Sequence, residues 1–264
     1  MESFLIGLQF LTRITIKTQT EWTEENFGKS VKYFPLIGAV IGIISAALTG
    51  IFYIVTGGKL PILTGAIAFT MPIIITGGIH CDGFIDSVDG LFSGREREKI
   101  LEIMKDSRVG AFGAVGLILL ATLEFATLIE LIKISITWTL SAIFSAPIIS
   151  RLMMVVTIGN FPYARREGMG KAFSKYTTNR TIFFALIETI LIFMPLVFFD
   201  VKIFLTEILA AIISLGFTFY FGNFAIKKIG GVTGDIYGAV STLVELIVLI
   251  IFLLTALNLS PNFS

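Results

Sequence analysis

Residues 60–90 read LPILTGAIAFTMPIIITGGIHCDGFIDSVDG, an apolar run that ends in a row of aspartates. The run 60–80 is long enough to cross the roughly 30 Å hydrocarbon core of a bilayer as a helix. Asp82, Asp86 and Asp89 follow it at spacings of four and seven residues. At 100° per residue these spacings place the three carboxylates within about 60° on one helix face. This stretch therefore predicts a membrane helix that leads into an acidic helix.

Apolar runs of similar length recur along the whole chain. It has 264 residues, of which 55% are hydrophobic, and its mean hydropathy is +0.90. Because a backbone in lipid must satisfy its own hydrogen bonds, these runs predict helices. We predict an all-α, polytopic integral membrane helix bundle that forms a single catalytic domain over 1–264. Its seven expected spans are 33–56, 60–80, 109–132, 134–158, 182–199, 203–225 and 236–258.

Two segments depart from the simple pattern of spans. The fifth span is the least regular, because Glu188 and Pro195 interrupt it. The first 16 residues are apolar but short, and they lack a basic segment and a cleavage site typical of a signal peptide. They predict an interfacial or re-entrant helix.

Basic residues concentrate in alternate connections, and by the positive-inside rule those connections face the cytoplasm. The N-terminus is therefore expected in the cytoplasm and the C-terminus outside, in a multi-pass protein of the cell (plasma) membrane. Three cytoplasmic connections, about 81–108, 159–181 and 227–236, are the expected catalytic loops. The basic residues on that side are Arg13, Lys17, Lys29, Lys32, Arg95, Arg97, Lys99, Lys105, Arg108, Arg165, Arg166, Lys171, Lys175, Arg180, Lys227 and Lys228.

The aspartate row is a candidate metal site. Carboxylates so close together repel one another unless a cation lies between them, and Mg²⁺ prefers oxygen ligands. If the second and third spans are antiparallel neighbours, Asp106 returns to the level of the row. The candidate metal ligands are therefore Asp82, Asp86, Asp89 and Asp106. The alternative is a solvated acidic helix end, although acids at bilayer depth are costly.

The other cytoplasmic loops contain candidate phosphate ligands. Arg165 and Arg166 lie beside glycines, and a guanidinium offers two parallel donors to phosphate oxygens. Glycines around Thr233 can present backbone N–H groups as an anion nest, and Asp235 could bind metal or accept a proton. The full set is Arg108, Arg151, Arg165, Arg166, Gly231, Thr233 and Gly234. The alternatives are basic residues that only set topology and a glycine loop that is only a flexible turn.

Together these residues predict metal-assisted phosphoryl transfer beside the membrane. A CDP-alcohol phosphotransferase is the nearest rival, but its pattern requires Ala-Arg after DGxx and a later pair of aspartates, which this chain lacks. A membrane prenyltransferase is a weaker version of the same idea. A cation-coupled transporter is expected to place its acids near the bilayer midplane, often in repeated halves. Here the acids lie at one face, and no repeat is evident.

The run GGIHCDGFIDSVDG, followed by REREKILEIMKDSRVGAFG, resembles the signature of the cobalamin synthase family, the adenosylcobinamide-GDP ribazoletransferases. The resemblance extends in order to FLTRI, FPLIGAVIG, SRLMM with PYARREGMG, and GGVTGDIYGA, and so covers most of the chain. One departure is Cys81, where the family pattern leads us to expect an apolar residue between the histidine and the aspartate.

The resemblance implies transfer that joins adenosylcobinamide-GDP to α-ribazole, or to its 5′-phosphate, with release of GMP and with Mg²⁺ as cofactor. The candidate catalytic residues are then Asp82, Asp86, Asp89, Asp106 and Asp235. The implied partners are these small molecules and the lipid bilayer. We expect no nucleic-acid partner, and the sequence is compatible with a homo-oligomer. It does not choose the general base.

Overall fold

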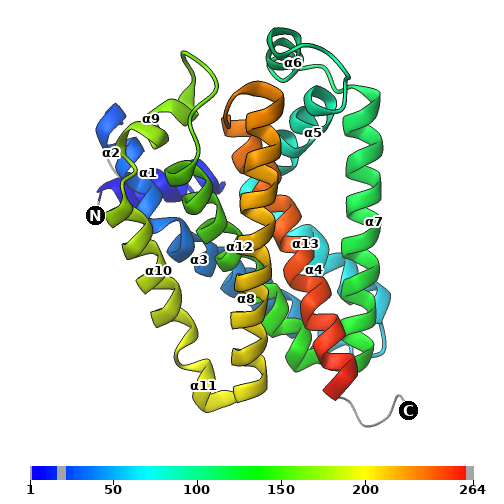
Figure 1. Cartoon of the computed structure of the whole chain (residues 1–264). Helices are drawn as coiled ribbons and strands as arrows, with labels where there is room; N and C mark the ends of the chain where they lie inside the picture. Colours follow the sequence, from blue (N-terminus) through cyan, green and yellow to red (C-terminus); the bar gives the residue numbers. More distant parts are fainter. Residues whose placement is uncertain (1, 17–21, 260–264) are drawn as a thin grey trace.

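The structure, a computed structural model, describes residues 2–16 and 22–259 (Figure 1). Within these residues the regular elements are helices, and the one β contact is an isolated parallel bridge between Tyr163 and Val232. The predicted all-α class is therefore confirmed.

Most of the predicted spans correspond to one long helix each. The described residues contain six helical segments long and apolar enough to cross a membrane, or seven if one bent pair counts as a span. The fifth span is broken at Pro195, as its sequence indicated, and its two parts together still pass this test. The helices are α3 (Phe34–Val55), α7 (Ala111–Ile134), α8 (Ile136–Asn160), α10 (Asn179–Phe193) with α11 (Leu196–Phe199), α12 (Val201–Ile229) and α13 (Gly234–Leu259).

The second span is shorter than predicted. α4 (Pro61–Thr76) ends before residue 80, and α5 (Ile79–Leu91) leaves it at 90°. Gly77 and Gly78 form the corner with φ of 64° and 73°. This is the left-handed region that terminates helices and that glycine adopts without a steric penalty. The corner turns the aspartate row away from the axis of α4, and His80 belongs to α5.

The N-terminal segment is helical but too short to span. α1 (Glu2–Leu11) buries Ile6, Leu8 and Leu11, and it packs against α2 (Glu24–Gly28) and the 3-10 helix η1 (Lys29–Tyr33). Its depth in the bilayer, and the cytoplasmic position of the N-terminus, stay predictions. Lys17 and the extreme C-terminus lie outside the described residues.

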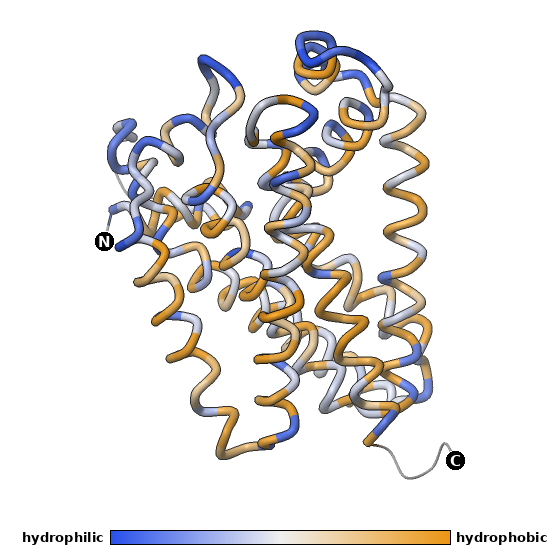
Figure 2. Tube along the Cα trace, viewed as in Figure 1, coloured by the Kyte–Doolittle hydropathy of each residue, from blue (hydrophilic) through white to orange (hydrophobic). Residues whose placement is uncertain are grey.

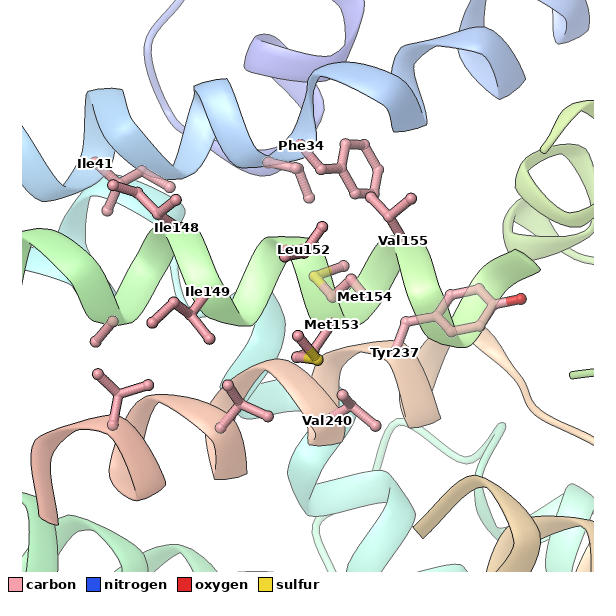
Figure 3. Close-up of a cluster of buried hydrophobic side chains, with 14 of the residues drawn as sticks. Phe34, Ile41, Ile148, Ile149, Leu152, Met153, Met154, Val155, Tyr237 and Val240 are labelled. Atoms are coloured by element: carbon pink, nitrogen blue, oxygen red, sulfur yellow. The ribbon is translucent and has the colours of Figure 1, made fainter. Parts of the chain in front are cut away.

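α8 is the central helix of the bundle, and most of its residues are buried. Figure 3 shows its apolar side chains between α3 and α13. Gly38 and Gly42 allow α3 to come close, because a Cβ on either would lie within 2.5 Å of a carbonyl oxygen of α8. On its other side, buried Arg151 of α8 forms an ion pair with Glu245 of α13.

Hydrophilic segments gather at one end of the bundle (Figure 2). This end holds α5, α6 (Arg97–Ile103), the loop before α9 (Met169–Tyr176) and the turn between α12 and α13 (Figure 1). These are the three connections in which the sequence placed the candidate catalytic residues.

Candidate active site

The aspartate row lies on a single helix, α5, at three different depths. Asp82 is exposed, Asp86 is half-buried and Asp89 is buried. α5 packs against α7 on one side and α13 on another. The three carboxylates therefore share a helix but have different surroundings.

Asp89 caps the start of α7. Its two carboxylate oxygens accept hydrogen bonds from the backbone N–H groups of Gly110 and Gly113, each at 2.8 Å. Gly110 is the N-cap of α7 and Gly113 is in its first turn, where N–H groups have no partner within the helix. A carboxylate there also interacts favourably with the helix dipole. Asp89 is thus already occupied in fixing α7 against α5.

Asp235 lies at the N-terminus of α13 and is held by two side chains. Arg165 donates to its Oδ2 at 2.7 Å, and the Thr233 hydroxyl donates to the same oxygen at 3.2 Å. Arg165 also donates to the carbonyl oxygen of Met104 at 3.3 Å. Arg165 of the second loop and the glycine loop before α13 are therefore joined through the Asp235 carboxylate.

The two acidic elements meet because glycines remove the side chains between them. A Cβ on Gly83 of α5 would lie 2.9 Å from the Asp235 carbonyl oxygen, and one on Gly238 of α13 would lie 3.2 Å from the Gly83 Cα. At this crossing Asp86 is within electrostatic range of Asp235, Asp82 and Asp89, with Arg165 as the nearby cation. The structure thus brings together carboxylates from two distant parts of the sequence.

Backbone contacts lock the second and third loops together. Ala164 donates to the Val232 carbonyl, and Val232 donates to the Pro162 carbonyl, both at 2.8 Å. Gly231 lets the two loops approach, since a Cβ there would lie 2.3 Å from the Pro162 oxygen. Gly231 therefore has a packing contact between the loops, and its phosphate-binding role stays a prediction.

Two cavities adjoin this cluster and share Asp82. One of about 140 Å³ is lined by Asp82, Asp235, His80, Gly234 and Tyr237 among others. The second, about 520 Å³, lies between the α4–α5 corner and the end of α1 and also includes Asp82. Asp82 therefore stands at the boundary between two spaces.

Known proteins resemble this sequence along nearly its whole length. Residues 3–253 match the pattern of the cobalamin-5-phosphate synthase family, CobS. The chain belongs to this family. An adenosylcobinamide-GDP ribazoletransferase of Fusobacterium nucleatum is 36% identical, over 96% of this chain and 97% of that protein. Proteins of the same name from Desulfitobacterium hafniense and Clostridioides difficile are 36% and 37% identical, each over 95% of this chain and 96% of their own. No solved structure matches it.

Membership in the cobalamin-5-phosphate synthase family makes the chain a membrane transferase of cobalamin biosynthesis. The resemblance that the motifs indicated is thereby confirmed. The aspartate row and the PYARREGMG and GGVTGD loops are the segments that meet at the site described above.

Not every predicted residue of this family member reaches the cluster. Asp106 accepts hydrogen bonds from Arg108 at the surface, the shortest 2.6 Å, and its other charged neighbour is Lys99. Arg151 is paired with Glu245 inside the bundle. Arg166 is exposed, in the loop before α9.

Arg97 is a residue that the sequence did not single out. It donates to the Ile229 carbonyl at the end of α12 at 2.8 Å, and to the Ala164 carbonyl at 3.2 Å. It thus ties the first loop to the other two. The sequence could not have identified Arg97, because Arg95 lies two residues earlier in the same charged run and no sequence signal distinguishes the two arginines.

The atoms at the site that could bind a metal are carboxylate oxygens, which suit a hard cation. Within residues 2–16 and 22–259, no three His, Cys, Asp or Glu side chains are grouped as a ready metal cage. Mg²⁺ commonly uses only one or two carboxylates and takes its other ligands from water and substrate phosphates. Asp82 and Asp86, which are not engaged by backbone amides as Asp89 is, fit that pattern.

Proposed function

We propose that this chain catalyses the last assembly step of the cobalamin nucleotide loop. It would join adenosylcobinamide-GDP to α-ribazole, or to its 5′-phosphate, and release GMP. The observation that carries the proposal is the meeting of Asp82, Asp86 and Asp235 with Arg165 beside two adjoining cavities. The names of its relatives supply the substrates. We place the site at the cytoplasmic face of the plasma membrane, because the basic loops surround it.

The reaction forms a bond from the ribose 3′-hydroxyl of ribazole to the phosphorus attached to cobinamide. The bond from that phosphorus to the oxygen of GMP breaks, GMP leaves with the electron pair, and the hydroxyl loses its proton. Mg²⁺, when bound, would neutralise charge on the diphosphate. Asp82 and Asp86 are its proposed ligands. Asp106 could join them only after leaving Arg108.

The remaining residues position the reactants. Asp235 is the proposed acceptor of the hydroxyl proton, and Arg165 with Thr233 fixes the orientation of its carboxylate. Asp89 holds α5 against α7, so that the two other aspartates of the row keep a fixed relation to α13. Gly234 lines the smaller cavity and leaves it open to a substrate.

The test is an assay of purified protein in lipid nanodiscs with adenosylcobinamide-GDP and each nucleoside, with and without Mg²⁺. We expect a coupled corrinoid product and one GMP per turnover, both dependent on Mg²⁺. Asp86→Asn should lower kcat by at least about 100-fold, because a neutral amide is a poor Mg²⁺ ligand. Asp200→Asn is the matched control. Asp200 caps the start of α12, at the opposite end of that helix from the turn that leads to Asp235, and asparagine also caps helices. No product under any condition would refute the proposal.

A further inference from the structure

The larger cavity is formed by the end of α1 and the corner between α4 and α5. Its lining residues include Phe10, Ile79 and Ile85, of which the first two also line the smaller cavity, and its volume is about 520 Å³. Asp82 lies at the edge that it shares with the smaller cavity. The space is therefore contiguous with the proposed reaction centre but reaches toward the N-terminal segment.

Arg13 is the basic residue among the described residues that line this cavity. Its backbone N–H donates to the Ile75 carbonyl at 2.7 Å, which fixes the segment after α1 to the end of α4. Its guanidinium lies over Gly77, where a Cβ would be 1.9 Å from Nε. The left-handed glycine at the corner thus provides the surface on which this side chain rests.

The Arg13 guanidinium has no acidic partner within the described residues, whereas the site's other arginine, Arg165, is already bound to Asp235. An exposed guanidinium that is positioned by packing, and whose N–H groups have no hydrogen-bond partner among the described residues, is suited to an anion from solution. Guanidinium groups bind phosphate oxygens through two parallel hydrogen bonds.

We propose that Arg13 forms a phosphate subsite for the nucleoside co-substrate, and that it binds the 5′-phosphomonoester of α-ribazole 5′-phosphate. This inference rests on the proposed function and extends it. Phe10 and the apolar walls would accept the aromatic base, and the shared edge at Asp82 would present the ribose hydroxyl to the smaller cavity. Arg13 would thus favour the phosphorylated nucleoside over the free one.

A phosphate could also come from a lipid headgroup, because the end of α1 is expected near the bilayer surface. The two sources share the same chemistry but differ in their consequences. A bound lipid would affect both nucleosides equally and would depend on anionic lipid. A nucleoside phosphate would affect one nucleoside only.

The experiment measures binding and steady-state kinetics of α-ribazole and α-ribazole 5′-phosphate with wild type, Arg13→Gln and Arg13→Lys. Nanodiscs of phosphatidylcholine alone, and of phosphatidylcholine with phosphatidylglycerol, provide the two lipid conditions. Arg180→Gln is the matched control, since Arg180 is an exposed arginine at the start of α10. Equilibrium binding of each nucleoside is measured without adenosylcobinamide-GDP, so that it does not depend on turnover.

For Arg13→Gln we expect the KM and Kd of the 5′-phosphate to rise about 10- to 100-fold, with kcat nearly unchanged. The values for free α-ribazole should stay within about twofold, and Arg13→Lys should recover part of the loss. Equal effects on both nucleosides, or an effect that follows the phosphatidylglycerol content, would overturn the subsite. Unchanged binding of the 5′-phosphate would also overturn it. If the variants show the expected differences in binding but wild type forms no product, the proposed reaction is refuted and the subsite is not.

Discussion

Asp89→Asn separates the two roles that a carboxylate in the aspartate row can have. In wild type both oxygens accept N–H groups at the start of α7. An asparagine side chain has one oxygen, so it retains one of these bonds and turns an NH₂ donor toward the other N–H. It also removes the negative charge from the start of α7.

The cost follows from these losses. A hydrogen bond to a buried charged group contributes about 1.5–3 kcal/mol, and the charge at a helix N-terminus adds about 0.3–1 kcal/mol. The substitution should therefore weaken the junction between α5 and α7 by about 2–4 kcal/mol. Because each 1.4 kcal/mol is tenfold in an equilibrium constant, the amides of Gly110 and Gly113 should exchange with solvent roughly 30- to 1000-fold faster.

Hydrogen exchange with mass spectrometry in nanodiscs measures this directly, and Mg²⁺ titration of the activity is the companion assay. We expect faster exchange at the start of α7, lower kcat, and a half-saturating Mg²⁺ concentration within about twofold of wild type. Asp86→Asn should give the reverse, with native exchange and impaired Mg²⁺ dependence. If Asp89→Asn preserves exchange but raises the Mg²⁺ requirement, Asp89 is a metal ligand and the capping argument is wrong.

Three further substitutions test the start of α7 and the loop before it. Gly113→Ala would place a Cβ 2.4 Å from an Asp89 oxygen and should lower the thermal midpoint. At Gly116 an added Cβ would lie 3.2 Å from the nearest atom, a methyl group of Val88, and 3.6 Å from the Phe84 ring, so Gly116→Ala should be close to neutral. An equal loss in both variants would contradict the contact between Gly113 and Asp89. Hydrogen bonds from Arg108 lower the pKa of Asp106 to about 2. The stability that this ion pair contributes is therefore fully present above the ordinary carboxyl pKa, and it is lost only as pH falls toward about 2. Asp106→Asn should therefore leave the pH dependence of the thermal midpoint unchanged between about pH 5 and 9; a changed Mg²⁺ requirement would assign Asp106 to the metal.

The features that the sequence predicted correctly depend on local pattern. Lengths of apolar runs gave the spans, and the spacing of the aspartates gave a single helix, because both follow from helix geometry. The 90° bend at Gly77 and Gly78, inside the span predicted over 60–80, was not predicted, because that angle depends on what α5 packs against.

The features that the sequence missed depend on partners far along the chain. The spacing made the three aspartates look equivalent, but Asp89 differs from the other two because it accepts hydrogen bonds from backbone amides at the start of α7. The sequence predicted Arg151 as a phosphate ligand, whereas in the structure its partner is Glu245 of α13. Charge and spacing alone do not reveal which acid an arginine will find, because the choice is made by tertiary packing.

The Arg151–Glu245 pair also has a consequence for how the protein is made. Its two members are 94 residues apart in the chain, so α8 is synthesised long before α13. At about 5–20 residues per second, Arg151 waits on the order of 5–20 s for its partner. An unpaired arginine near the middle of a membrane helix costs about 2.5–3.5 kcal/mol on insertion scales. We therefore expect nascent α8 to remain at the translocon or with an insertase until α13 has been synthesised. A chain truncated before α13 should be a substrate for membrane quality control.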